Sequence, residues 1–270
     1  MSRFLLDDEL SKRISKELPN LEELQHMIYS LRPTGISMNF HWESNVPIAA
    51  VCFQDVIETL EEAVYALSEF YAHKIWYSEK REPPNEVLST FYSRFYLNDV
   101  AFRLYSAGEH LANAIIFMLD LSDEQVKIYR EKKVSQQSVV GNYLLKEAPG
   151  HPITSAVQLL AKSTHWQNTR NYRDRIVHDQ PPTVEGLGIV YKRKKRWKER
   201  FDGTVKTMIL GFGSTGDQPE YALDEILGFI QPALFEFIEV AKIVLEHYLK
   251  LLESHNITLL KSGGLQVKFF

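Results

Sequence analysis

Side chains that could handle a phosphate group are concentrated near the middle of the chain. Arg173, Asp174 and His178 lie close together at the predicted end of a helix, and Pro181 and Pro182 follow them. A histidine can move protons near neutral pH, and a guanidinium group can balance charge on the oxygens of a phosphate transition state. These residue types therefore indicate a site for phosphodiester chemistry.

The spacing of this group raises a geometric question. On a regular helix Arg173 and His178 would point about 140° apart, because five residues turn the chain by about 500°. Gln180 precedes a proline, and proline both disfavours helical geometry in the preceding residue and cannot extend a helix. We therefore expect the last turn to unwind and to bring His178 towards Arg173. The alternative is a solvated helix end, where basic residues are common because they complement the helix dipole.

Residues 162–175 are polar at nearly every position, although they follow an apolar stretch in the helix predicted over 152–177. A helix that is polar on all sides is either exposed to solvent or lines a polar cleft. Arg170 is a candidate phosphate contact in the second case and a solvated neighbour in the first. Both interpretations remain open at this point.

A second basic group follows in residues 192–200, which read KRKKRWKER in a chain whose formal net charge is −4. Basic residues at this density can bind the phosphate backbone of a nucleic acid, and a tryptophan among them can stack on an unpaired base. The alternative is a solvated loop in which Trp197 packs back onto the protein. The candidate nucleic-acid contacts are Lys192, Arg193, Lys194, Lys195, Arg196, Trp197, Lys198 and Arg200.

Helical periodicity dominates the elements that must position these residues. Apolar residues recur at three- and four-residue steps over 47–79, 86–120 and 220–254, which predicts three long helices. The predicted fold class is mainly α: a helical bundle of long antiparallel helices with a small β-hairpin inserted before the last helix. The remaining elements are expected over 5–30 (short helices), 33–43 (extended), 122–132 (helix), 135–147 (helix), 152–177 (helix) and 187–213 (β-hairpin).

Local signals add detail to these helices. Ser122 followed by Gln125 three residues later predicts a capping box. Phe91 and Phe95 fall on the apolar stripe of the second long helix, which is the side expected to face the core. The apolar stripe of the last helix predicts either core or a dimer interface.

Composition limits the classes of protein to consider. The apolar fraction of 44% and the charged fraction of 24% are typical of a globular protein, and Cys52 is the single cysteine. The sequence contains neither an apolar run long enough to span a membrane nor a histidine spacing typical of a metal site. We therefore expect a cytoplasmic protein with no metal, no cofactor and no membrane partner.

The segment RDRIVH, from Arg173 to His178, is similar to the signature of the HEPN superfamily. The order of two long helices, shorter helices and then the helix with the motif is similar as well. The resemblance covers roughly residues 47–180, and the last helix would complete the bundle. Residues 1–46 would then be an N-terminal extension, and residues 47–270 a HEPN-like domain with the hairpin as an insertion.

The resemblance implies a metal-independent endoribonuclease, often a toxin or defence nuclease, that acts as a homodimer on RNA. It implies that His178 moves the proton, that Arg173 stabilises the phosphorane and that Asp174 orients them or the substrate. The products would be a 2′,3′-cyclic phosphate and a 5′-hydroxyl, and an antitoxin protein would be a second partner. Some members of the superfamily are non-catalytic modules, so the alternative is a HEPN-like domain that binds a nucleotide, a nucleic acid or a protein. A purely structural helical scaffold is a third interpretation.

Overall fold

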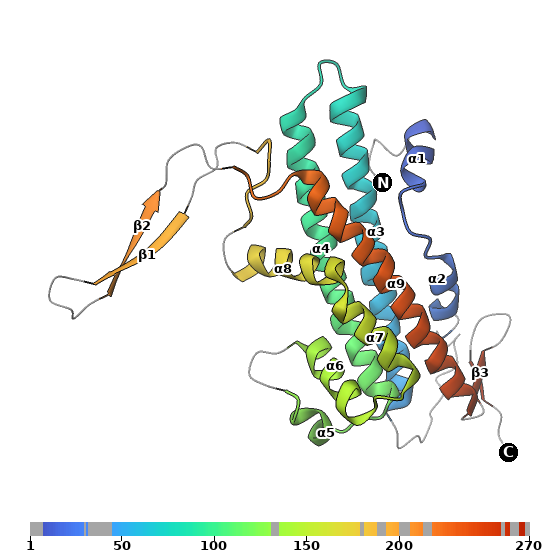
Figure 1. Cartoon of the computed structure of the whole chain (residues 1–270). Helices are drawn as coiled ribbons and strands as arrows, with labels where there is room; N and C mark the ends of the chain where they lie inside the picture. The colour runs from blue at the N-terminus through green and yellow to red at the C-terminus, as the bar shows by residue number, and fades with distance from the viewer. Residues whose placement is uncertain are drawn as a thin grey trace.

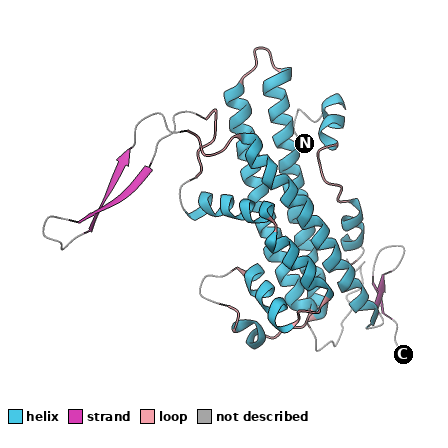
Figure 2. Ribbon diagram, viewed as in Figure 1, coloured by secondary structure: helices cyan, strands magenta, loops and turns pink. Residues whose placement is uncertain are grey.

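The computed structural model describes residues 8–29, 31, 45–130, 135–178, 181–187, 193–199, 206–212, 218–254, 257–259 and 265–267. The described chain is mainly helical, and its helices pack into a bundle (Figures 1 and 2). The mainly α class predicted from the sequence is therefore confirmed. Within these residues, no helix combines the length and the apolar character needed to cross a membrane.

Two long antiparallel helices form the centre of the bundle. They are α3 (Ala49–Ile75) and α4 (Glu86–Met118), which lie side by side along most of their length (Figure 1). A π-helical segment (Trp76–Lys80) follows α3, and the side chain of Asn85 accepts a hydrogen bond from Leu88 N at the start of α4. Burial recurs on α3 at the three- and four-residue steps that its sequence predicts, at Phe53, Val56, Ile57, Leu60, Ala63, Leu67 and Phe70.

A buried polar pair joins these two helices. Glu69 of α3 is 1% exposed, and its carboxylate lies 3.5 Å from Nε2 of His73 one turn later. The His73 ring stacks on Tyr92 and Tyr96 of α4, with ring centroids 4.7 and 5.1 Å away. Burial lowers the pKa of His73, and the Glu69 carboxylate acts in the opposite direction. The periodicity of α3 did not reveal this pair, because Glu69 resembles any other polar residue of an exposed helix face.

Two short amphipathic helices pack against α3, and both lie in the range where the sequence predicts them. They are α1 (Asp8–Ser15) and α2 (Glu22–Tyr29). Leu24 and Ile28 are fully buried in the main hydrophobic core, so α2 is an integral part of the bundle. The extended segment predicted over 33–43 lies outside the described residues.

Two further helices lie below the centre of the bundle in Figure 1. α5 (Asp123–Lys127) begins with the predicted capping box: Ser122 Oγ accepts from Gln125 N at 3.3 Å, and Gln125 Oε1 accepts from Ser122 N at 2.8 Å. The helix is shorter than the predicted range of 122–132. α6 (Gln136–Glu147) matches its prediction within one residue.

The single helix predicted over 152–177 is in fact two helices, α7 (Pro152–Lys162) and α8 (Thr164–His178). Ser163 between them has extended backbone angles, φ −60° and ψ 130°. Its hydroxyl accepts a hydrogen bond from the backbone N–H three residues later, as N-cap serines do, and donates one to Glu236 of α9. A contact with a distant helix therefore sets the break.

The last long helix, α9 (Leu223–Ser254), crosses the bundle and contacts α4, α7 and α8. Its apolar stripe is core: Leu234, Phe237, Ala241 and Val244 are all at most 1% exposed. Four short strands complete the described chain. β1 (Arg193–Glu199) pairs antiparallel with β2 (Lys206–Phe212), apart from the helices in Figure 1, and β3 (Ile257–Leu259) pairs with β4 (Leu265–Val267).

Phe91 and Phe95 do not face the core, which corrects the sequence prediction for α4. They are 52% and 58% exposed, and Val87 one turn earlier is 63% exposed. The buried line at this end of α4 instead passes through the small residues Ser89 and Ser93, which allow α3 to approach closely. Phe91 and Phe95 lie two residues further on in each case, and two residues turn a helix by about 200°. They form an exposed apolar line.

Two helical glycines are expected to respond in opposite directions to replacement by alanine. A Cβ at Gly141 of α6 would have no heavy atom within 4 Å, whereas a Cβ at Gly108 of α4 would lie 2.6 Å from Nε2 of Gln137. Gly141→Ala should raise the free energy of unfolding by about 0.5–1 kcal/mol, the difference in helix propensity. Gly108→Ala should lower it, because the methyl group displaces Gln137 from its hydrogen bond to Tyr105 O. Urea unfolding measures both changes, and a gain for both variants would contradict this packing.

His151, at the start of α7, is expected to make stability depend on pH. Its ring lies edge-on to the ring of His247, with centroids 4.6 Å apart. Burial, and then the neighbouring His247, lower the pKa of His151. At pH values between the lowered pKa and the usual pKa, His151 is therefore protonated in the unfolded chain and neutral in the folded protein. Stability should fall as the pH drops below about 6.5, the usual pKa of a histidine in an unfolded chain.

His151→Asn should reduce this loss of stability at low pH, and asparagine also favours the start of a helix. Urea unfolding at about pH 8 and about pH 5 measures the effect. The exposed His26 provides a matched control, because His26→Asn should keep the wild-type dependence on pH. An equal loss of stability in wild type and His151→Asn would show that His151 does not cause it.

Candidate functional site

Three buried side chains fix α8 against the bundle. The Trp166 indole stacks on Phe237 of α9, with ring centroids 5.6 Å apart and an interplanar angle of 9°. Thr169 Oγ1 donates a hydrogen bond to Phe229 O at 3.2 Å. The buried Tyr172 donates its hydroxyl proton to Asn98 Oδ1 of α4 at 2.7 Å, and burial raises the pKa of Tyr172. This face of α8 determines where every other side chain of the helix points.

His178 lies on the opposite side of α8 from these three residues. Thr169 and His178 are nine residues apart, which corresponds to a turn of about 900°, or half a turn beyond two full ones. His178 is accordingly exposed, and the apolar Val177 beside it is 47% exposed. The imidazole therefore faces away from the bundle, where another molecule can reach it.

The predicted unwinding of the last turn is wrong. α8 remains helical through His178, so the side chains of Arg173 and His178 diverge by about 140°. Pro181 disfavours helical geometry only in the residue before it, Gln180, and Gln180 follows His178 in the chain. Within a single chain, these two residues therefore do not converge.

Arg173 lies at the edge of the buried face and is held from two sides. Its Cζ atom is 4.0 Å from the ring centroid of Tyr105 on α4, which is a close cation–π contact. Its Nη1 donates to Asp174 Oδ1 at 2.8 Å, and the Arg173 side chain is only 19% exposed. Nε of Arg173 is buried and has no hydrogen-bond partner among the described residues. The guanidinium group is thus held in position from two sides.

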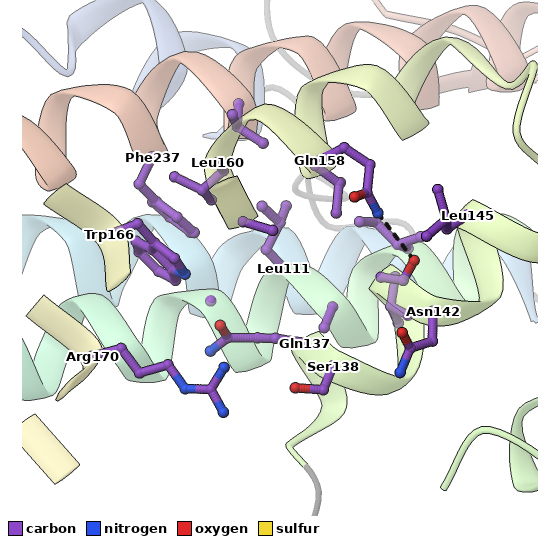
Figure 3. A pocket seen from close by; sticks show the side chains of 18 of the residues that line it. Leu111, Gln137, Ser138, Asn142, Leu145, Gln158, Leu160, Trp166, Arg170 and Phe237 are labelled. Atoms are coloured by element: carbon purple, nitrogen blue, oxygen red, sulfur yellow. Dashed lines mark hydrogen bonds between the residues drawn. The ribbon is translucent and has the colours of Figure 1, made fainter. Parts of the chain in front are cut away.

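A continuous polar line runs along α8 instead of an isolated pair. Gln167, Arg170, Asp174 and His178 fall within a sector of about 80° on a regular helix. Asp174 Oδ2 lies 3.9 Å from Arg170 Nε, so its carboxylate stands between two guanidinium groups. At the other end of the line, Arg170 and Gln167 line a cavity of about 310 Å³ (Figure 3). The polar helix is therefore partly exposed and partly the wall of a cavity.

Arg175 is not part of this line. Its Nη1 lies 2.6 Å from Glu220 Oε2, and this ion pair raises the pKa of Arg175 and lowers the pKa of Glu220. The contact joins α8 to the segment that precedes α9. Arg175 therefore has a structural partner of its own.

The candidate nucleic-acid contacts 193–198 lie on strand β1, and Trp197 is in register with Met208 of β2. Lys192 and Arg200, the two ends of the basic cluster, lie outside the described residues. Strand β1 pairs with β2 along its whole described length. In the described part of the chain, no three His, Cys, Asp or Glu side chains gather as a metal site would require.

No family model matches this chain, and neither a curated protein nor a solved structure gives a significant match to it. Sequence reasoning selected Arg173, Asp174 and His178 but missed Tyr105, because no local pattern links an aromatic residue of α4 to an arginine of α8. The only indication of this contact in the sequence is that the helix α4 is rich in aromatic residues.

The contact between Arg173 and Tyr105 should be measurable as a coupling free energy. In a double-mutant cycle of Arg173→Met and Tyr105→Leu, urea unfolding should give a coupling of about 0.5–2 kcal/mol. The ion pair of Arg175 and Glu220 is a suitable comparison, since both side chains are about a third or more exposed, at 34% and 44%. Its coupling should be at most about 1 kcal/mol and should weaken in high salt. A vanishing coupling between Arg173 and Tyr105 would contradict the cation–π contact.

Proposed function

We propose that this chain is a metal-independent endoribonuclease that acts as a homodimer, with Arg173, Asp174 and His178 at the reacting phosphate. One observation supports this above the others: an outward-facing histidine ends a polar line on α8, and an arginine of the same helix is held in a fixed position at the edge of the bundle. The HEPN resemblance of residues 173–178 points to the same chemistry.

The proposed reaction needs only proton transfer and charge balance. His178 takes the proton of a ribose 2′-hydroxyl as its oxygen attacks the adjacent phosphorus. A bond forms between phosphorus and the 2′-oxygen, the bond to the 5′-oxygen breaks, and a second histidine returns a proton to the 5′-oxygen. Arg173 balances the charge that develops on the phosphorane oxygens, and Asp174 holds the guanidinium in place. The products are a 2′,3′-cyclic phosphate and a 5′-hydroxyl.

A second copy of the chain is part of the proposal because one chain does not bring the groups together. Arg173 lies against Tyr105, whereas His178 points away from the bundle. Two α8 helices that face each other in an antiparallel manner would bring His178 of one chain near the arginines of the other. Such a site also contains two histidines, one for each proton transfer.

Exposed apolar side chains near α8 offer a surface for this association. Val87, Phe91 and Phe95 form a line on α4 and are each more than half exposed, and Val177 is the exposed apolar residue next to His178. α4 is also the helix on which α8 packs, through Asn98 and Tyr105. Apolar area of this kind is typical of the core of a dimer interface.

RNA would be held by the remaining basic residues. Arg170 continues the line of α8, and the cluster of Lys192, Arg193, Lys194, Lys195, Arg196, Lys198 and Arg200 would contact phosphates, with Trp197 stacking on a base. In this proposal the small β-hairpin is an RNA-binding insertion before the last helix. A toxin or defence role in the cytoplasm and an antitoxin partner come from the HEPN resemblance.

A non-catalytic binding module is the second candidate. It is favoured by the state of Arg173, whose guanidinium already has a carboxylate partner in Asp174 and an aromatic one in Tyr105. A group with these partners can bind a phosphate without taking part in a reaction. The same polar line of α8 would then bind a nucleotide, a nucleic acid or a protein.

Cleavage of labelled RNA in the presence of EDTA distinguishes the two candidates. Wild-type protein should cleave, and its products should end in a 2′,3′-cyclic phosphate. His178→Ala should reduce the rate by about 100-fold or more, because a general acid–base group contributes at least that factor. The exposed His26 gives a matched control: His26→Ala should cleave at the wild-type rate.

The dimer is tested with the same assay and with light scattering. Phe91→Glu combined with Phe95→Glu should give a monomer that no longer cleaves RNA. Equal RNA binding by wild type and His178→Ala with no cleavage by either would support the binding module. Cleavage that disappears with EDTA and returns with Mg²⁺ would contradict the metal-independent mechanism.

A further inference from the structure

A cavity of about 310 Å³ opens between α4, α6, α7, α8 and α9 (Figure 3). Gln167 and Arg170 line it from the first half of α8, and Arg170 is eight residues, or about 12 Å along the helix axis, from His178. Sites for small molecules have volumes of about 300–1,000 Å³. This cavity is therefore large enough for a small organic ligand.

One wall of the cavity is apolar and flat. The Trp166 indole lines it, is 8% exposed and is held parallel to Phe237, which lines the cavity as well. Leu111 of α4 and Leu160 of α7 extend this wall. A rigid aromatic surface of this kind favours a flat ligand, since rings stack with little loss of conformational entropy.

Amide side chains line the rest of the cavity, and hydrogen bonds orient them. Gln137 Nε2 donates to Tyr105 O at 3.0 Å, and Gln158 Nε2 donates to Gly141 O at 3.2 Å. Gln167 Nε2 donates to Ala161 O at 2.9 Å. Each amide is thereby fixed, and its oxygen remains an acceptor with two lone pairs. A ligand with several polar edges satisfies such a wall better than a hydrocarbon does.

Among the described residues that line the cavity, Arg170 alone has a charged side chain. Its side chain is 43% exposed and extends towards Gln137 and Ser138 of α6 (Figure 3). Its ion-pair contact with Asp174 is long, at 3.9 Å, so the N–H groups at the edge of the guanidinium remain able to bind an anion. One cation at the rim matches one anionic group on the ligand.

A glycine keeps the cavity open. Gly141 lies in the interior of α6 and lines the cavity, and a Cβ there would have no heavy atom within 4 Å. Glycine in a helix interior costs about 1 kcal/mol relative to alanine. The position therefore lowers helix stability while it leaves space next to the amide groups.

We propose that this cavity binds a small organic anion with a flat heteroaromatic body. The ring lies against Trp166, the amides contact its polar edges, and Arg170 pairs with the anionic group. A nucleoside 5′-monophosphate and an aromatic carboxylate share this chemistry. The site goes beyond the proposed RNA cleavage, because occupancy requires no reaction at His178 and is measured without one.

Calorimetric titration and thermal unfolding of the full-length chain test the proposal. The probes are AMP, GMP, CMP and UMP for the first source and indole-3-acetate for the second. At least one probe should bind with a stoichiometry of one ligand per chain and should raise the Tm. Binding of a nucleoside monophosphate would identify the ligand class as nucleotides, and binding of indole-3-acetate would identify it as aromatic carboxylates. The corresponding ligand without its anionic group should bind about ten-fold or more weakly.

Matched variants locate the ligand. Gly141→Leu, which fills the cavity, should abolish binding, whereas Gly141→Ala should retain it. Arg170→Gln alters an exposed side chain and so does not threaten the fold; it should weaken binding of the anion about ten-fold and leave the uncharged analogue unaffected. The proposal is overturned if no probe binds the wild-type chain. It is equally overturned if Gly141→Leu and Arg170→Gln bind like wild type.

Discussion

Burial of one face of α8 is the constraint on which the rest of the candidate site depends. A helix of 15 residues with this many polar side chains is marginal by itself in water. Contact with α4 and α9 stabilises it, and the burial of the rings of Trp166 and Tyr172 contributes about 2 kcal/mol each. Once these rings are in place, helix geometry directs Arg173 to the edge of the bundle and His178 to solvent.

Local patterns predicted the elements well, because their causes are local. The long helices follow from apolar periodicity, and the capping box follows from two residues three positions apart. The break between α7 and α8 could not be predicted in this way, because Ser163 bonds to Glu236, 73 residues later in the chain. The exposure of Phe91 likewise depends on which face of α4 the neighbouring helix covers.

For the candidate site, too, the sequence predicted which residue types are present but not which residues they contact. Spacing identified Arg173 and His178 as residues suited to phosphate chemistry, but it gave the wrong geometry for the end of the helix. Prolines terminate a helix only from the residue before them onwards, so His178 stays in the last turn. The contacts that fix Arg173 come from Tyr105, a residue of another helix, and no spacing rule contains that information.

Asp174 has a consequence for how charge is distributed over α8. Its carboxylate lies 2.8 Å from Arg173 and 3.9 Å from Arg170, so three ionised side chains share a net charge of +1. When an anion draws Arg170 towards the cavity, the Asp174 carboxylate pairs with Arg173 alone. When an anion binds at Arg173, the Asp174 carboxylate pairs with Arg170 alone. By thermodynamic linkage, each end of the helix then influences the affinity of the other to the same extent. One carboxylate thus serves as a shared counter-ion for two places on the protein surface.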